Sequence, residues 1–118
     1  MTLEQFYNII GGSSIKILDR LGEESFIKKF IVKFLDDPTF KLLNEDVQNK
    51  NLDKANFDAH TLKGVCAMLG FIKLKELTEQ FLLCLKQDES YEEIWQLLKN
   101  EYELIIQTIE KTNWKDYV

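Results

Sequence analysis

Apolar residues recur every three or four positions along most of the chain, a spacing that places them on one face of an α-helix. Such stripes predict four longer helices, and strand-like alternation is absent. The predicted helices cover residues 23–36, about 54–69, 72–86 and 91–109, with a shorter segment at 39–49. Four longer helices joined by short loops predict an all-α fold, an antiparallel four-helix bundle with short additional N-terminal helices packed over one end. We expect a single domain over residues 1–118.

Local signals mark several helix ends. Thr2-x-x-Gln5 and Ser90-x-x-Glu93 have the spacing of capping boxes, Asp37-Pro38 separates two helices, and Gly70 is placed to end the 54–69 helix. The pattern also predicts which side chains point inward in the N-terminal third: Leu3, Phe6, Ile9 and Ile10, then Ile15, Leu18 and Leu21, then Phe26, Phe30, Ile31 and Phe34.

The only histidine of the chain, His60, lies in the 54–69 helix. Lys63 and Gly64 follow it by three and four residues, so the three positions share one helix face. The apolar stripe of this helix is centred roughly 130° away on a helical wheel. The stripe consists of Ala55, Ala59, Leu62, Cys66 and Leu69. His60 is therefore expected to point toward solvent.

This arrangement suits a histidine that accepts a phosphoryl group. A neutral imidazole is nucleophilic near neutral pH, and one nitrogen attacks while a hydrogen bond holds the other. The Lys63 ammonium can neutralise an anion carried on the attacking nitrogen. Glycine within a helix lowers its stability by roughly 0.5–1 kcal/mol relative to alanine. At Gly64 this cost is explained if a side chain there would block the approach of a partner to His60. The alternatives are a solvated lysine at Lys63 and close helix packing at Gly64.

The stretch Ala59-His60-Thr61-Leu62-Lys63-Gly64, with Leu69-Gly70 ten residues after His60, resembles the signature of histidine-containing phosphotransfer (HPt) domains. Arg20-Leu21-Gly22 leading into Phe26, Phe30 and Phe34 is also similar to that family, as is Leu74 after Gly70. The resemblance runs from about Leu18 to Lys86.

Many HPt domains carry a polar residue 22 positions after the histidine, where it hydrogen-bonds the imidazole, but here that position is Leu82. Glu79, one turn earlier on the same face, is the expected substitute that orients the ring, or else an ordinary surface acid. Leu82 and Lys86, one turn beyond it, are candidate partner-binding residues. Lys86 would add positive potential for an acidic partner, or else be solvated.

Three further residues lie on the same flank of the His60 helix. Asp53, Asn56 and Ala67 are candidates for the rim of a partner-docking surface. The alternative for each is a plain solvent-exposed helix position.

Composition excludes several classes of function. The net charge is −5 at pH 7, and the chain has no basic tract and no glycine-rich phosphate loop, so nucleic-acid and nucleotide binding are not expected. The longest apolar run, residues 81–85, is too short to cross a bilayer. Cys66 and Cys84 lack metal-ligand spacing and are expected to be buried free thiols. We expect no metal site, no cofactor, and a cytoplasmic monomer.

The resemblance implies a phosphoryl carrier that exchanges phosphate through phosphohistidine at His60 with receiver (response-regulator) domains, including that of a hybrid sensor kinase. The receiver would supply the divalent metal, and this chain would have no independent turnover. One alternative is a helical adaptor that binds receivers without accepting phosphate. Another is a metal- or small-molecule-binding bundle, which the shortage of ligands outside the core argues against.

Overall fold

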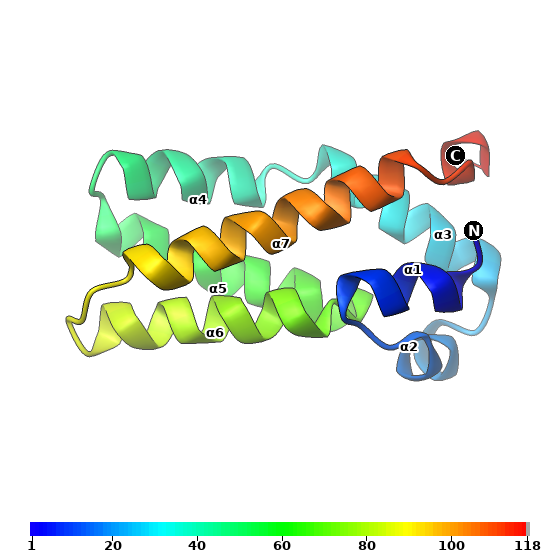
Figure 1. Ribbon diagram of the computed structural model, residues 1–118, viewed down its shortest axis with the longest axis horizontal. Coiled ribbons are helices and arrows are strands. Elements are labelled where there is room, and N and C mark those ends of the chain that lie inside the picture. The colour runs from blue at the N-terminus through cyan, green and yellow to red at the C-terminus, as the bar shows by residue number, and fades with distance from the viewer. Residues whose placement is uncertain (118) are drawn as a thin grey trace.

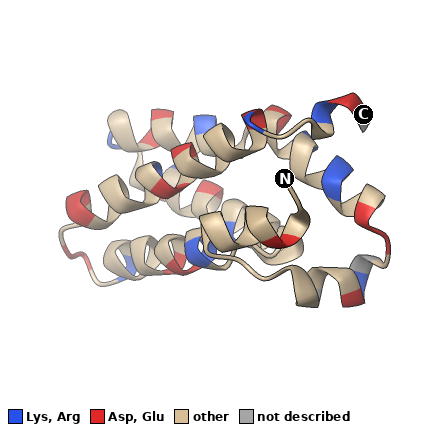
Figure 2. Ribbon diagram, turned by 45° about the vertical axis from the view of Figure 1, so that its right-hand side comes forward, with Lys and Arg blue, Asp and Glu red and all other residues tan. Residues whose placement is uncertain are grey.

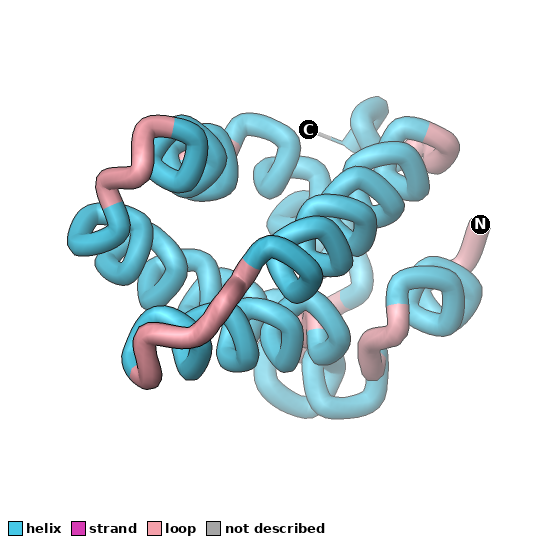
Figure 3. Tube along the Cα trace, turned by 60° about the vertical axis from the view of Figure 1, so that its left-hand side comes forward, coloured by secondary structure: helices cyan, strands magenta, loops and turns pink. Residues whose placement is uncertain are grey.

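The computed structural model describes residues 1–117, and the side chains of all of these except Lys16, Leu21 and Tyr117. The described part consists of helices joined by short loops, without strands (Figure 3). Its α-helices are α1 (Leu3–Ile10), α2 (Ser14–Leu21), α3 (Glu24–Lys33), α4 (Thr39–Gln48), α5 (Leu52–Leu69), α6 (Ile72–Lys86) and α7 (Glu92–Glu110). Two short 3₁₀ helices, η1 (Phe34–Asp36) and η2 (Trp114–Tyr117), follow α3 and α7. No helix of the described residues is long and apolar enough to span a bilayer.

Helices α4 to α7 form an antiparallel bundle, as predicted (Figure 1). Its first member is α4, which was predicted as a shorter segment, and not the helix predicted at residues 23–36. Consecutive helices pack against each other, and rings close the bundle between α4 and α7. Phe40 of α4 stacks on Tyr102 of α7 with ring centroids 3.8 Å apart, and lies 5.7 Å from the Trp95 ring. Every helix of the bundle therefore contacts two neighbours, and α5 and α6 lie side by side along most of their length.

The short helices cover one end of the bundle, as predicted. Their apolar side chains join an aromatic cluster in which Phe6 of α1 lies 5.2 Å from the Trp114 ring and 6.2 Å from the Phe71 ring, centroid to centroid. Phe34 lies 5.1 Å from Phe71 on the opposite side. This cluster ties both ends of the chain to the loop between α5 and α6, and so fixes the end of the helix that carries His60.

The inward face of the N-terminal helices differs from the prediction. Phe26 is 51% exposed and Phe30 is also exposed, whereas Ile27 and Val32 are buried beside the predicted Ile31 and Phe34. The two preceding helices also bury a different face from the predicted one. Ile9 and Ile15 are exposed, and Tyr7 and Ile17 are buried instead. In short helices, two apolar faces satisfy the three- and four-residue spacing, and the neighbouring elements decide which one is covered.

The cap predictions were right in part. At α1, Thr2 and Gln5 form the complete capping box, and Gly70 ends α5 in the left-handed conformation with φ 73°. The second predicted capping box is wrong, because α7 starts at Glu92 after Tyr91 and no side chain caps it. Ser90 instead donates its hydroxyl hydrogen bond to a Glu92 carboxylate oxygen, at 2.6 Å.

Candidate functional site

The candidate site is built on α5, whose boundaries follow from the local sequence. Asn51 caps the N-terminus by accepting a hydrogen bond from the Lys54 amide at 3.4 Å, and the Gly70 amide donates to the Cys66 carbonyl at the other end. All five residues of the predicted apolar stripe are buried. The opposite face, which includes His60 and Gly64, is exposed.

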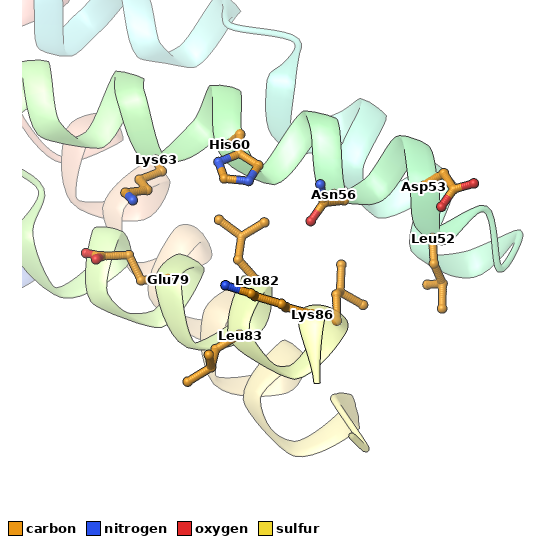
Figure 4. Close-up of a pocket in the computed structure, with 10 residues that line it drawn as sticks. Leu52, Asp53, Asn56, His60, Lys63, Glu79, Leu82, Leu83 and Lys86 are labelled. Atoms are coloured by element: carbon orange, nitrogen blue, oxygen red, sulfur yellow. The ribbon is translucent and has the colours of Figure 1, made fainter. Parts of the chain in front are cut away.

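A pocket of about 590 Å³ lies between α5 and α6, and His60 and Lys63 project into it (Figure 4). Leu82 lies opposite His60 and Glu79 lies opposite Lys63 in this view. The lining residues are Leu52, Asp53, Asn56, His60, Lys63, Glu79, Leu82, Leu83, Leu85 and Lys86. Seven residues predicted as catalytic or partner-binding therefore meet at one hollow: Asp53, Asn56, His60, Lys63, Glu79, Leu82 and Lys86.

Gly64 leaves open space beside this pocket. A Cβ atom built at Gly64 would meet no heavy atom within 4 Å, apart from its own helix backbone and chain neighbours. Close packing against another helix, the alternative explanation for this glycine, is therefore wrong within the described structure. The missing side chain leaves the surface next to His60 open from the solvent side.

The carboxylate of Glu79 is directed to another partner. Its Oε1 lies 3.8 Å from the Lys75 Nζ, one turn earlier on α6, and it forms no hydrogen bond with His60 within the described residues. Both side chains of this pair are substantially exposed. Leu82, the residue at the position that is polar in many HPt domains, is buried and forms the floor under the imidazole.

Ala67 is exposed on the His60 face of α5 but does not line the pocket. Its carbonyl oxygen accepts a hydrogen bond from Nη1 of Arg20, on α2, at 3.2 Å. The carbonyl of Leu69, in the same last turn, accepts the Tyr7 hydroxyl at 2.8 Å. The short N-terminal helices thus satisfy carbonyls that a helix C-terminus leaves without partners.

The cysteines lie away from this face. Cys66 is buried in the stripe, where burial raises the pKa of its thiol, and Cys84 is half-buried rather than buried. Among the described residues no three His, Cys, Asp or Glu side chains are grouped as metal ligands would be.

The family model of the Hpt domain matches residues 35–111, about two thirds of the chain. The chain belongs to the Hpt domain family. Members of this family are phosphotransfer modules of two-component signalling. Comparisons with curated proteins and with solved structures gave no match.

The match places α4 to α7 of this Hpt domain, with all the predicted site residues, inside the family region. Residues 1–34 lie outside it. The upstream resemblance around Arg20-Leu21-Gly22 therefore concerns a segment that the family match does not include. Residues 1–34 still contact the His60 helix, through Tyr7 of α1 and Arg20 of α2.

Two exposed apolar residues of α5 near His60 were missed from the sequence. Phe57 is 69% exposed and Met68 is 49% exposed, and both lie within about 80° of His60 on the α5 wheel, on the side of Gly64. The signal was present, because both are large apolar residues that fall outside the buried stripe of α5. They enlarge the candidate docking face of the Hpt domain beyond the pocket.

Proposed function

We propose that this Hpt domain is a cytoplasmic phosphoryl carrier that accepts a phosphoryl group on His60 from the phospho-aspartate of one receiver domain and passes it to an aspartate of another. The observation that carries the proposal is the position of His60. The ring is exposed on α5, projects into a pocket with Lys63, and has open space at Gly64. A partner can reach the imidazole without moving any part of the bundle.

The chemical step is an in-line displacement at phosphorus. The lone pair of one His60 ring nitrogen forms the N–P bond, the O–P bond to the receiver aspartate breaks, and its electron pair returns to the aspartate carboxylate. Transfer to a second receiver is the same step in reverse. Positioning and neutralisation of the phosphoryl oxygens account for most of the acceleration in such reactions.

In this proposal Lys63 supplies one positive charge beside the phosphoryl group, from one turn along α5. The receiver supplies its divalent metal ion and the remaining charge, so this chain acts as substrate and carrier without independent turnover. Glu79 orients the non-reacting ring nitrogen. For that it must leave Lys75, and an exposed ion pair of this kind is worth about 1 kcal/mol or less.

The experiment is transfer from isolated receiver domains, phosphorylated with acetyl phosphate and Mg²⁺, to the purified protein. Intact-mass measurement should show one added phosphoryl group that is lost in acid. His60→Gln is the control, since it removes the nucleophile at an exposed position and should leave the fold intact. Lys63→Gln should still accept the group, but more slowly.

The outcomes separate the proposal from its alternatives. Acid-labile phosphorylation that is absent in His60→Gln supports the carrier. Binding of receivers without transfer would indicate the adaptor instead, and phosphorylation that persists in His60→Gln would show that His60 is not the acceptor.

A further inference from the structure

The short helix α2 brings a cation to the His60 face of α5. Nη1 of Arg20 lies 3.2 Å from the carbonyl oxygen of Ala67, which is exposed seven residues after His60. A step of seven residues along an α-helix is about 20° short of two full turns, so Ala67 and His60 lie on the same face. They are about 10 Å apart along the helix axis. Arg20 is itself exposed. Its guanidinium is therefore anchored near His60 while staying accessible to a partner.

The surface between the two residues is continuous. Arg20, Ala67 and Lys75 line a second hollow, of about 160 Å³, where α2 meets α5 and α6. Lys75 is paired with Glu79, which lines the His60 pocket. The Lys75–Glu79 pair therefore lies between the two hollows, and a partner that binds over His60 would also contact the surface toward α2.

This combined surface differs in charge from the rest of the protein. The whole chain has 20 acidic and 15 basic residues, and both signs are interspersed along the helices in Figure 2. Along the two hollows cations outnumber carboxylates. The cations are Arg20, Lys63, Lys75 and Lys86, and the carboxylates are Asp53 and Glu79. An acidic partner surface is the complement of such a strip.

The size of a protein interface puts Arg20 within reach of that partner. A stable complex covers about 800 Å² on each side, equivalent to a disc of about 16 Å radius. A receiver centred on His60 must therefore cover positions about 10 Å away along α5. Ala67 and the guanidinium bonded to it lie inside this footprint.

We propose that Arg20 is a docking residue that binds an acidic side chain of the receiver domain beside its phospho-aspartate, and so helps to select the receiver. The inference rests on the proposed function for the identity of the partner. Because α2 lies outside the family match, this contact is a feature by which this chain can distinguish receivers.

The test measures receiver binding and transfer separately. Receiver binding is measured by calorimetry in a His60→Gln background, with each receiver of a panel that includes one from a hybrid kinase, and transfer is measured with His60 intact. Arg20→Gln removes the charge but keeps a donor for the Ala67 carbonyl, and Arg20→Glu reverses the charge. Lys111→Gln, at an exposed position just after α7, removes the same charge away from the two hollows. Thermal unfolding checks that every variant is folded.

We expect Arg20→Gln to raise the dissociation constant about 3- to 10-fold, Arg20→Glu to raise it further, and Lys111→Gln to change it less than 2-fold. At saturating receiver concentration, the rate of transfer to His60 in Arg20→Gln and in Lys111→Gln should stay within 2-fold of the rate of the unsubstituted protein. Normal transfer with no effect of Arg20→Gln on binding, or equal effects of Arg20→Gln and Lys111→Gln, would overturn this inference alone. Arg20-dependent binding without phosphorylation of His60 would overturn the proposed function alone, and absence of binding by any receiver would overturn both.

Discussion

Replacing Gly64 by alanine should make this protein more stable and a poorer phosphoryl acceptor. Gly64 lies within α5, five residues before the helix ends at Leu69, and an added Cβ meets no heavy atom within 4 Å outside the adjoining helix backbone. The methyl group therefore fits the free protein without strain. Alanine in a helix is favoured over glycine by about 1 kcal/mol, which corresponds to a rise in Tm of about 3–6 °C for a domain of this size.

The same methyl group stands where a receiver must approach. Gly64 is one helical turn from His60 and about 40° around the axis. In-line attack needs the ring nitrogen and the phosphorus about 3–3.5 Å apart, and a displacement of about 1 Å costs roughly 100-fold in rate. We therefore expect Gly64→Ala to slow transfer at least about 10-fold.

The assay follows phosphohistidine formation after rapid mixing with a phosphorylated receiver, and urea unfolding of the same samples. Thr61→Ala is the matched control on the same helix. Thr61 is exposed, and its replacement also raises helix propensity, by about 0.5 kcal/mol, while it removes atoms near His60 instead of adding them. A slow Gly64→Ala beside a normal Thr61→Ala would assign the loss to steric access. Transfer at the wild-type rate in Gly64→Ala would refute the steric argument, and a lower stability would refute the open space at this position.

Three further predictions concern single side chains. Lys63→Met keeps a flexible, unbranched side chain but removes the charged ammonium, so the rate of transfer to His60 should fall about 10-fold with Tm nearly unchanged, in the same rapid-mixing assay. Phe57→Ser should raise the receiver concentration at half-saturation several-fold without lowering Tm by more than about 2 °C, because the ring is 69% exposed in the free protein. Burial raises the pKa of Glu101 to about 7 against an ordinary value of 4.5, although the charge of Lys73 lowers it in part. Between pH 4.5 and pH 7 the unfolded chain therefore binds fewer protons at this residue than the folded protein does. The contribution of Glu101 to stability should therefore fall by roughly 1–3 kcal/mol as the pH rises from about 4.5 to 7, and urea unfolding at pH 5 and pH 8 should show that Glu101→Gln removes this contribution.

The long helices could be predicted from sequence because their apolar residues recur at helical spacing over several turns, although buried polar side chains such as Asp58 and Glu101 interrupt the buried faces. The α5 stripe leaves a single orientation, so the exposure of His60 follows from the residue spacing alone. In α2 and α3 the apolar residues fall on two adjacent faces. The covered face there is decided by contacts with η2 and α5, which the local pattern does not contain.

The side-chain contacts of the site could not be read from residue spacing, whereas the exposed Phe57 and Met68 could have been. The hydrogen bond from Arg20 to Ala67 joins positions 47 residues apart, and no local spacing indicates it. Glu79 pairs with Lys75 and not with His60. Residue spacing does not show this either, because Lys75 and His60 both lie near the face of α6 that carries Glu79. Residue types showed that charged groups belong near His60, but the contacts that each one makes required the packed structure.

The contacts that hold α5 in place do not involve its exposed face, where His60 lies. The helix is fixed by its buried stripe, by the Asn51 and Gly70 caps, and by the Tyr7 hydroxyl on the Leu69 carbonyl. None of these contacts involves His60. Substitutions on the exposed face can therefore change docking or transfer while the free energy of unfolding stays nearly constant or, at Gly64, increases. Selection for stability alone would place alanine at Gly64, so the glycine is best explained by what has to approach the histidine beside it.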